Sequence, residues 1–121
     1  MINFEVDQPL NRLVIRYSGS VRAKDTEEGL NQIQSGLAQL QTSFCLLVDL
    51  TNLDSMDVKC APSIEKAMDL CNAKGASMVV RVIPDPHRDI GMTIMSIFHY
   101  RGDVQIITCQ TLAEAEQALS S

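Results

Sequence analysis

Aspartates, a lysine and a cysteine crowd a short stretch of the chain, from the end of the apolar run FCLLVDL at 44–50 onward. Carboxylates so close together can hold a metal ion, share a proton or bind a basic partner. In the alternative, Asp54 is solvated in a loop and Asp57 caps the helix that Pro62 helps to open. No histidine or glycine-rich loop accompanies the acids, so no metal or other cofactor is predicted. The residues concerned are Asp49, Asp54, Asp57, Lys59 and Cys60.

Cys60 lies at a predicted helix start beside Lys59, and both features lower the pKa of a thiol. This context is typical of a reactive thiol in an enzyme or a redox sensor. No CxxC partner accompanies Cys60, however, and His87 and His99 are distant in the sequence. In the alternative, Cys60 is a small, half-buried residue that packs the helix start.

The size and charge of the chain narrow the classes of function. The 121 residues fit one domain that can bury a core without disulfides or metals. The net charge of -5 and the pI near 4.8 argue against nucleic-acid binding, because phosphate contacts need a basic face. The cysteines show no zinc spacing, no secretory signal is evident, and the apolar runs are too short to span a bilayer. We therefore expect a reduced cytoplasmic protein without membrane insertion.

Hydrophobic spacing predicts the element order β-β-α-β-α-β-α-β-α. The first two strands are expected to form a hairpin, and the helix after them is expected to be capped near Asp25. Strands that alternate with helices imply a largely parallel sheet, so the predicted fold class is α/β, with about five strands and four helices. The predicted strands are 2–6, 12–19, 44–50, 77–83 and 104–108, and the predicted helices are 23–40, 61–73, a third after the break at 84–89, and a last one from 111.

The predicted third helix is apolar around much of its circumference. One face cannot bury all of its apolar residues against the sheet. The excess predicts a self-association surface or a lipophilic pocket that includes Ile90, Met92 and Met95. A wide stripe facing the core is the alternative. The triplet HRD at 87–89 opens this helix as an acid–base pair, an anion grip or a solvated helix start.

Three motifs occur in the order found in a known family: VDLTNLDSMD at 48–57, AKGASMVV at 73–80 and TLAEAEQAL at 111–119. Together with the order of elements, they resemble the STAS domain, the fold of bacterial anti-sigma-factor antagonists. The resemblance covers nearly the whole chain and implies a single STAS-like domain over 1–121. In that family, Met- or Ile-Asp-Ser-Ser-Gly opens a helix, and a kinase phosphorylates the second serine, which switches partner binding.

The chain departs from the family at the switch itself. Asp57 matches the family aspartate, but Val58, Lys59 and Cys60 follow where the family has Ser-Ser-Gly. Lys59 therefore stands at the phosphoacceptor position and places a fixed positive charge where phosphorylation would add negative charge. Ser55 and Ser63 flank the turn, either as displaced acceptors or as ordinary caps.

The resemblance implies a non-enzymatic regulatory module for signal transduction. It would dock a partner through the loop and helix around residues 54–64, without the usual serine switch. The partner would be an anti-sigma kinase, another STAS-containing regulator or a transporter ATPase, and a homodimer is a further option. The residues expected to bind the partner are Asp54, Ser55, Met56, Asp57, Lys59, Cys60 and Ser63. The alternative function is a small-molecule carrier or sensor that uses a pocket beside the predicted third helix.

Overall fold

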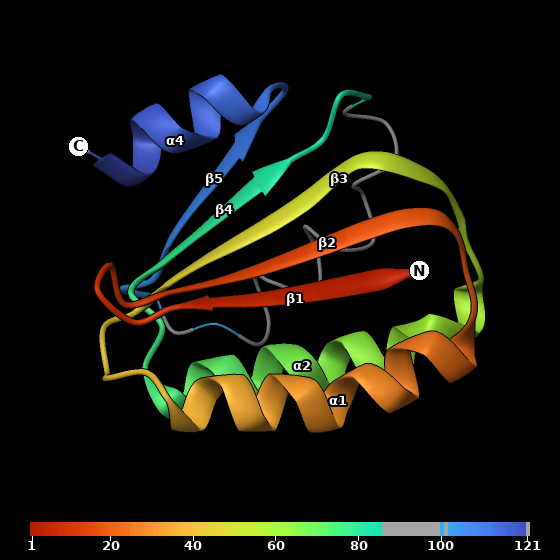
Figure 1. The fold of residues 1–121 in the computed structure, drawn as a ribbon, viewed down its shortest axis with the longest axis horizontal. Coiled ribbons are helices and arrows are strands. Elements are labelled where there is room, and N and C mark those ends of the chain that lie inside the picture. The colour runs from red at the N-terminus through yellow and green to blue at the C-terminus, as the bar shows by residue number, and fades with distance from the viewer. Residues whose placement is uncertain (86–99, 101, 121) are drawn as a thin grey trace.

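The chain forms one five-stranded sheet with helices on both faces (Figure 1). This computed structural model describes residues 1–85, 100 and 102–120. The strands are β1 (Ile2–Asp7), β2 (Arg12–Val21), β3 (Cys45–Met56), β4 (Met78–Val82) and β5 (Gln105–Cys109). The helices are α1 (Ala23–Ala38), α2 (Ala61–Lys74) and α4 (Leu112–Ser120), with a short 3-10 turn, η1 (Val58–Cys60), before α2.

The strands lie in the order β1-β2-β3-β4-β5. β1 pairs with β2 in antiparallel orientation, and all other neighbouring strands are parallel. The predicted α/β class with a mixed, mostly parallel sheet is therefore confirmed. The predicted number of helices differs, since the described residues hold three α-helices rather than four. The predicted third helix, with the triplet at 87–89 and with Ile90, Met92 and Met95, lies outside the described residues.

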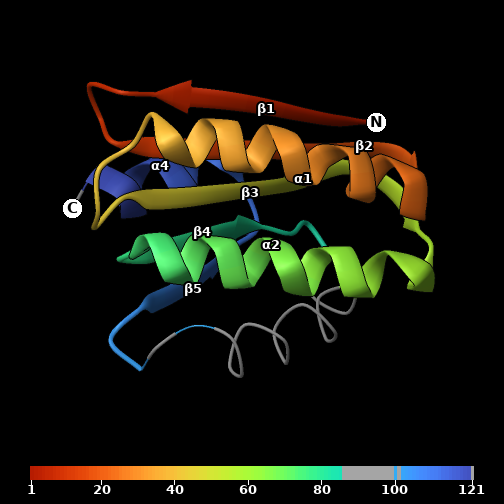
Figure 2. The same cartoon turned by 90° about the horizontal axis from the view of Figure 1, so that it is seen from below.

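Each face of the sheet has its own apolar cluster. α1 and α2 lie side by side on one face, and α4 lies on the other (Figures 1 and 2). The larger cluster, under α1 and α2, includes the fully buried Leu13 and Phe44. The smaller cluster, under α4, includes Leu47, Val80 and Ala115. Side chains of β3 that point to either face of the sheet are thus buried, which explains the nearly continuous apolar run at the start of this strand.

Two glycines of α1 bring this helix onto the edge of the sheet. A Cβ atom at Gly29 would lie 3.0 Å from the ring of Phe4, and one at Gly36 would lie 3.1 Å from a methyl group of Val6. Glycine lowers helix propensity by about 1 kcal/mol relative to alanine. At these two positions, the absence of a Cβ allows α1 to approach β1 closely.

β3 is longer than the sequence predicts. It continues past the apolar run to Met56, paired with β2, and the register shifts twice near Gly19, whose φ is +66°. Figure 1 shows β2 and β3 curving together toward η1 and the start of α1. Asp54 and Ser55 therefore lie on the exposed end of a strand and not in a loop. Backbone pairing with β2 extends the strand, and beyond Leu50 the side chains of Leu53 and Met56 still pack against the larger cluster.

Candidate functional site

The end of β3 is joined to α2 by η1, whose geometry is fixed by Asp57. The backbone N–H of Asp57 donates to the carbonyl of Val21 at 3.0 Å, which ties the turn to the end of β2. The Asp57 carboxylate accepts from the backbone N–H of Lys59 at 2.9 Å. Asp57 is thus the N-cap of η1, as the capping alternative predicted. The cap holds the residues after Asp57 in one conformation at the surface.

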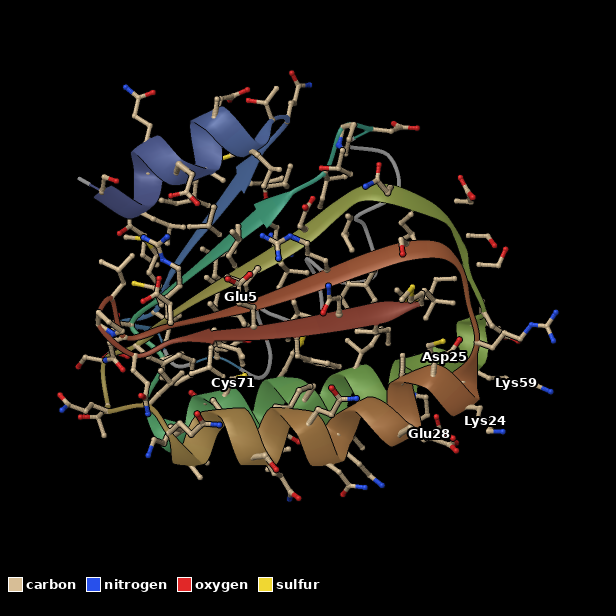
Figure 3. All side chains as sticks on the ribbon, viewed as in Figure 1. Glu5, Lys24, Asp25, Glu28, Lys59 and Cys71 are labelled. Carbon is tan, nitrogen blue, oxygen red and sulfur yellow. The ribbon has the colours of Figure 1, made fainter. Side chains whose placement is uncertain are left out.

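η1 presents an apolar side chain and a cation to solvent. The side chain of Val58 is 86% exposed, and Lys59 is also exposed. Figure 3 shows Lys59 at the end of the molecule where α1 begins, on the side of Lys24 and Asp25. Val58 was not among the residues predicted to bind a partner. A lone apolar residue between two charged ones on a predicted turn was the signal that could have identified it.

The two candidate serines differ in accessibility. Ser55 is exposed at the end of β3, and its hydroxyl donates to the hydroxyl of Ser20 at 3.1 Å. Ser63 lies in the first turn of α2 and is only 7% exposed. A modifying enzyme or a docking partner can reach Ser55 in this conformation, whereas Ser63 belongs to the packing of α2.

Cys60 is fully buried. Its thiol donates to the carbonyl of Val21 at a sulfur–oxygen distance of 3.7 Å. Burial raises the pKa of this thiol, although a hydrogen bond with Thr26 acts in the opposite direction. The position beside Lys59 at a helix start thus does not make Cys60 a ready thiolate. The structure supports the packing alternative.

We expect iodoacetamide at pH 7.5 to alkylate Cys60 about tenfold or more slowly than a free thiol, because the buried thiol must first be exposed by opening of the structure. Cys45, which is half-buried, is the internal control and should react faster. Mass spectrometry of digested protein separates the two sites. Alkylation of Cys60 as fast as a free thiol would contradict its burial.

The three aspartates are not brought together as a metal site. Asp49 is 5% exposed, and its carboxylate accepts from both the backbone N–H, at 2.9 Å, and the hydroxyl of Thr51. Its second oxygen lies 3.8 Å from Nε of Arg16. Among the described residues, no group of three His, Cys, Asp or Glu side chains is placed to hold a metal ion. Asp49 instead stabilises the strand, Asp57 caps η1, and Asp54 is solvated.

Arg81 is a buried cation that the sequence analysis did not select. It is 3% exposed on β4, and its guanidinium donates to the hydroxyl of Thr108 at 3.0 Å. It lines a cavity of about 30 Å³ together with Tyr17, Cys71 and Tyr100. This volume holds about one or two water molecules. The pocket predicted beside Ile90 involves residues outside the described part of the chain, so it stays a prediction.

Within the described residues, no α-helix combines the length and the apolar character needed to cross a bilayer.

Comparison with known proteins identifies the fold through solved structures. No family model and no curated protein matches the chain. An uncharacterised protein of the DUF3478 family with a SpoIIAA-like fold, from Shewanella loihica PV-4, matches with a TM-score of 0.71 and 19% identity, over 98% of this chain and 92% of its own. The anti-sigma factor antagonist SpoIIAA in its unphosphorylated form matches with a TM-score of 0.69 and 15% identity, over 100% and 99% of the two chains.

A third solved structure is the Bacillus cell fate determinant SpoIIAA in its phosphorylated form. It matches with a TM-score of 0.64 and 14% identity, over 98% of this chain and 99% of its own. At these identities the comparisons establish the fold, and they agree with the predicted resemblance. The chain therefore has the SpoIIAA-like STAS fold.

Proposed function

We propose that this protein is a non-enzymatic regulatory module that docks a partner protein through the end of β3 and η1. The docking surface consists of the exposed residues Asp54, Ser55, Asp57, Val58 and Lys59, with the half-buried Met56 beneath them. The observation that carries the proposal is the position of Lys59. It is exposed on a capped turn, at the place that matches the phosphoacceptor serine of the resembling family.

A fixed cation at this position excludes the usual switch there. A phosphoserine carries about -1.5 to -2 charges at neutral pH, whereas lysine carries a constant positive charge. Phosphorylation at position 59 therefore cannot regulate docking. Binding would be constitutive or controlled elsewhere, and the exposed Ser55 is the nearest candidate. By resemblance, the partner is an anti-sigma kinase, another STAS-containing regulator or a transporter ATPase, within a cytoplasmic signalling pathway.

The state of the thiols supports a non-enzymatic role. Burial raises the pKa of Cys60, Cys71 and Cys109, which is the opposite of what a nucleophilic thiol needs at neutral pH. The most exposed chemical groups of the docking surface are instead a lysine, carboxylates and an apolar side chain, and such charges can pair with opposite charges on a partner.

Reversing the charge at Lys59 tests the proposal. We expect wild-type protein, used as bait in lysate of the source cells, to recover a kinase, a STAS-containing regulator or a transporter ATPase. Lys59→Glu should weaken binding of the purified partner about tenfold or more, since a like-charged or unpaired group then faces the partner's surface. Titration calorimetry with the purified pair measures the change.

Lys66→Glu is the matched control, because it makes the same charge change at an exposed position of α2 outside the docking surface. It should bind like wild type. Equal affinity of wild type and Lys59→Glu for the partner would contradict the proposed surface. Equal weakening by both variants would show that net charge, and not Lys59, determines binding.

A further inference from the structure

The outer edge of β1 offers unpaired backbone groups. β1 is the first strand of the sheet and, among the described residues, pairs only with β2. Met1 and Ser18 exchange two hydrogen bonds, at 2.8 and 2.9 Å. In antiparallel pairing, the residues that exchange such bonds alternate with residues whose N–H and C=O groups point away. The outward groups of β1 therefore belong to Ile2, Phe4 and Val6.

β1 carries two acidic side chains, Glu5 and Asp7, but lacks the other features that commonly block an edge strand. Natural edge strands are usually blocked by lysine, proline or a bulge. The sequence INFEVD contains neither lysine nor proline, and its register with β2 runs without a shift over all six residue pairs. The edge is therefore open to another strand.

A groove runs along this edge between β1 and α1. It has a volume of about 290 Å³. Figure 2 shows β1 at the outer side of α1, at the edge of the molecule. The half-buried Phe4 and Val6 form an apolar floor. The exposed α1 side chains that line it are Asn31, Gln32, Ser35 and Gln39.

The helix side of this groove carries no charge, because residues 29–48 contain no Asp, Glu, Lys, Arg or His. Amide and hydroxyl side chains at a groove rim can donate to and accept from a peptide backbone. Apolar side chains of an added strand can fill the groove without facing a buried charge. The groove thus fits one face of an extended peptide.

The opposite face of β1 carries the carboxylates of Glu5 and Asp7, with Arg16 and Arg12 of β2 on their inner side. Glu5 is exposed and lies 3.0 Å from the guanidinium of Arg16, and Figure 3 shows it on the side of the sheet away from α1. Asp7 follows two residues later and so faces the same side. A strand added beside β1 would place every second side chain next to these carboxylates. Cationic side chains are favoured there, because opposite charges on neighbouring strands attract.

We propose that β1 binds an extended segment of a partner protein, in which apolar residues alternate with lysine or arginine, as a sixth strand of the sheet. Strand addition of this kind supplies affinity through the backbone and specificity through alternate side-chain sites. A second copy of this chain fits less well, because pairing of two β1 strands would gather Glu5 and Asp7 of both copies on one face. The site goes beyond the proposed function, since no residue of the docking surface lines the groove.

Amide hydrogen exchange tests this proposal on the intact protein. The probe is a seven-residue peptide of alternating valine and lysine, with both ends capped. At saturating peptide, we expect exchange of the Phe4 and Val6 amides to slow about tenfold or more, because their outward N–H groups become hydrogen-bonded. The same peptide with every residue N-methylated cannot pair with β1 in either strand orientation and should leave both rates unchanged. Unchanged rates with the unmodified peptide would overturn the proposal.

Two variants separate strand addition from nonspecific attraction to an acidic protein. Glu5→Lys should weaken peptide binding about tenfold, whereas Glu65→Lys, an equal charge change on exposed α2, should not. Equal weakening by both variants would overturn the proposal. So would slow exchange of Phe4 and Val6 without peptide in a protein that sediments as a dimer, because a second copy would then occupy the edge.

Discussion

Raising the pH from 9 to 11 is expected to lower the free energy of unfolding by about 3 kcal/mol, chiefly through Cys71 and Tyr17. Burial raises the pKa of the Cys71 thiol to about 12, from an ordinary value of 9.0. Burial also raises the pKa of Tyr17 above its ordinary value of 10.0. Figure 3 shows Cys71 between the sheet and α2, which is where ionisation would place a charge in the core.

The direction of this change in stability follows from the numbers of protons that the folded and unfolded states bind. Above pH 9, the unfolded chain loses the proton of Cys71 while the folded protein keeps it, so unfolding releases protons and stability falls as the pH rises. Each such group lowers stability by about 1.4 kcal/mol per pH unit until the folded thiol also ionises. Tyr17 begins to contribute above pH 10. Below pH 9 the stabilising effect of the neutral groups is fully present.

Urea denaturation at half-unit pH steps measures the slope of the unfolding free energy against pH. Cys71→Ala should reduce this slope between pH 9 and 10, where its thiol contributes before Tyr17 and together with Cys60 and Cys109, whose pKa values burial also raises. Cys45→Ala is the matched control, since Cys45 is half-buried at the start of β3, and it should keep the wild-type slope. Stability that is constant from pH 9 to 11 would show that Cys71 and Tyr17 are accessible to water.

Replacing Phe44 by alanine should destabilise the protein by about 3–5 kcal/mol, the usual range for a buried phenylalanine. Phe44 is fully buried in the larger apolar cluster, directly before β3. The substitution removes buried apolar surface and leaves a cavity that the surrounding strands and helices fill only in part. Since domains of this size are stable by about 5–15 kcal/mol, much of the variant could unfold in mild denaturant.

The midpoint of urea unfolding reports this loss, provided that the slope with denaturant is unchanged. Leu10→Ala is the control, because Leu10 is 58% exposed in the β1–β2 turn and should cost less than about 0.5 kcal/mol. A loss below about 1 kcal/mol for Phe44→Ala would mean that the core closes over the vacated space.

Most of the fold could be predicted because the hydrophobic pattern changes period where the elements change. β4 lies within its predicted strand, and β5 ends one residue past the predicted end, at Cys109. α2 ends at Lys74, one residue past its predicted end, and Gly75 follows with a φ of +101°. The first helix begins at Ala23, as predicted, but its N-cap is Arg22 and not Asp25. Asp25 lies inside the first turn of the helix. From there its carboxylate accepts a hydrogen bond from the backbone N–H of Arg22, at 3.0 Å.

The candidate site could be predicted only in part. A capping aspartate and an exposed lysine depend on neighbouring residues in the sequence, so Asp57 and Lys59 were identified correctly as features of one turn. The burial of Cys60 and Ser63 depends on how closely α1 and β2 approach the start of α2, which no local pattern contains. The groove beside β1 also escaped prediction, because the close contacts of Gly29 with Phe4 and of Gly36 with Val6 join residues far apart in the sequence.

The order of strands in the sheet is the order of strands in the chain. Every strand therefore joins an edge that already exists, and no strand has to be inserted between two others. During synthesis, the sheet can grow from β1 toward β5 as the chain leaves the ribosome, with α1 covering the first hairpin before β4 is made. The growing edge moves from β2 to β5, while the outer edge of β1 is present from the first pairing onward. A nascent chain would thus offer the β1 edge to a binding segment before the rest of the domain is complete.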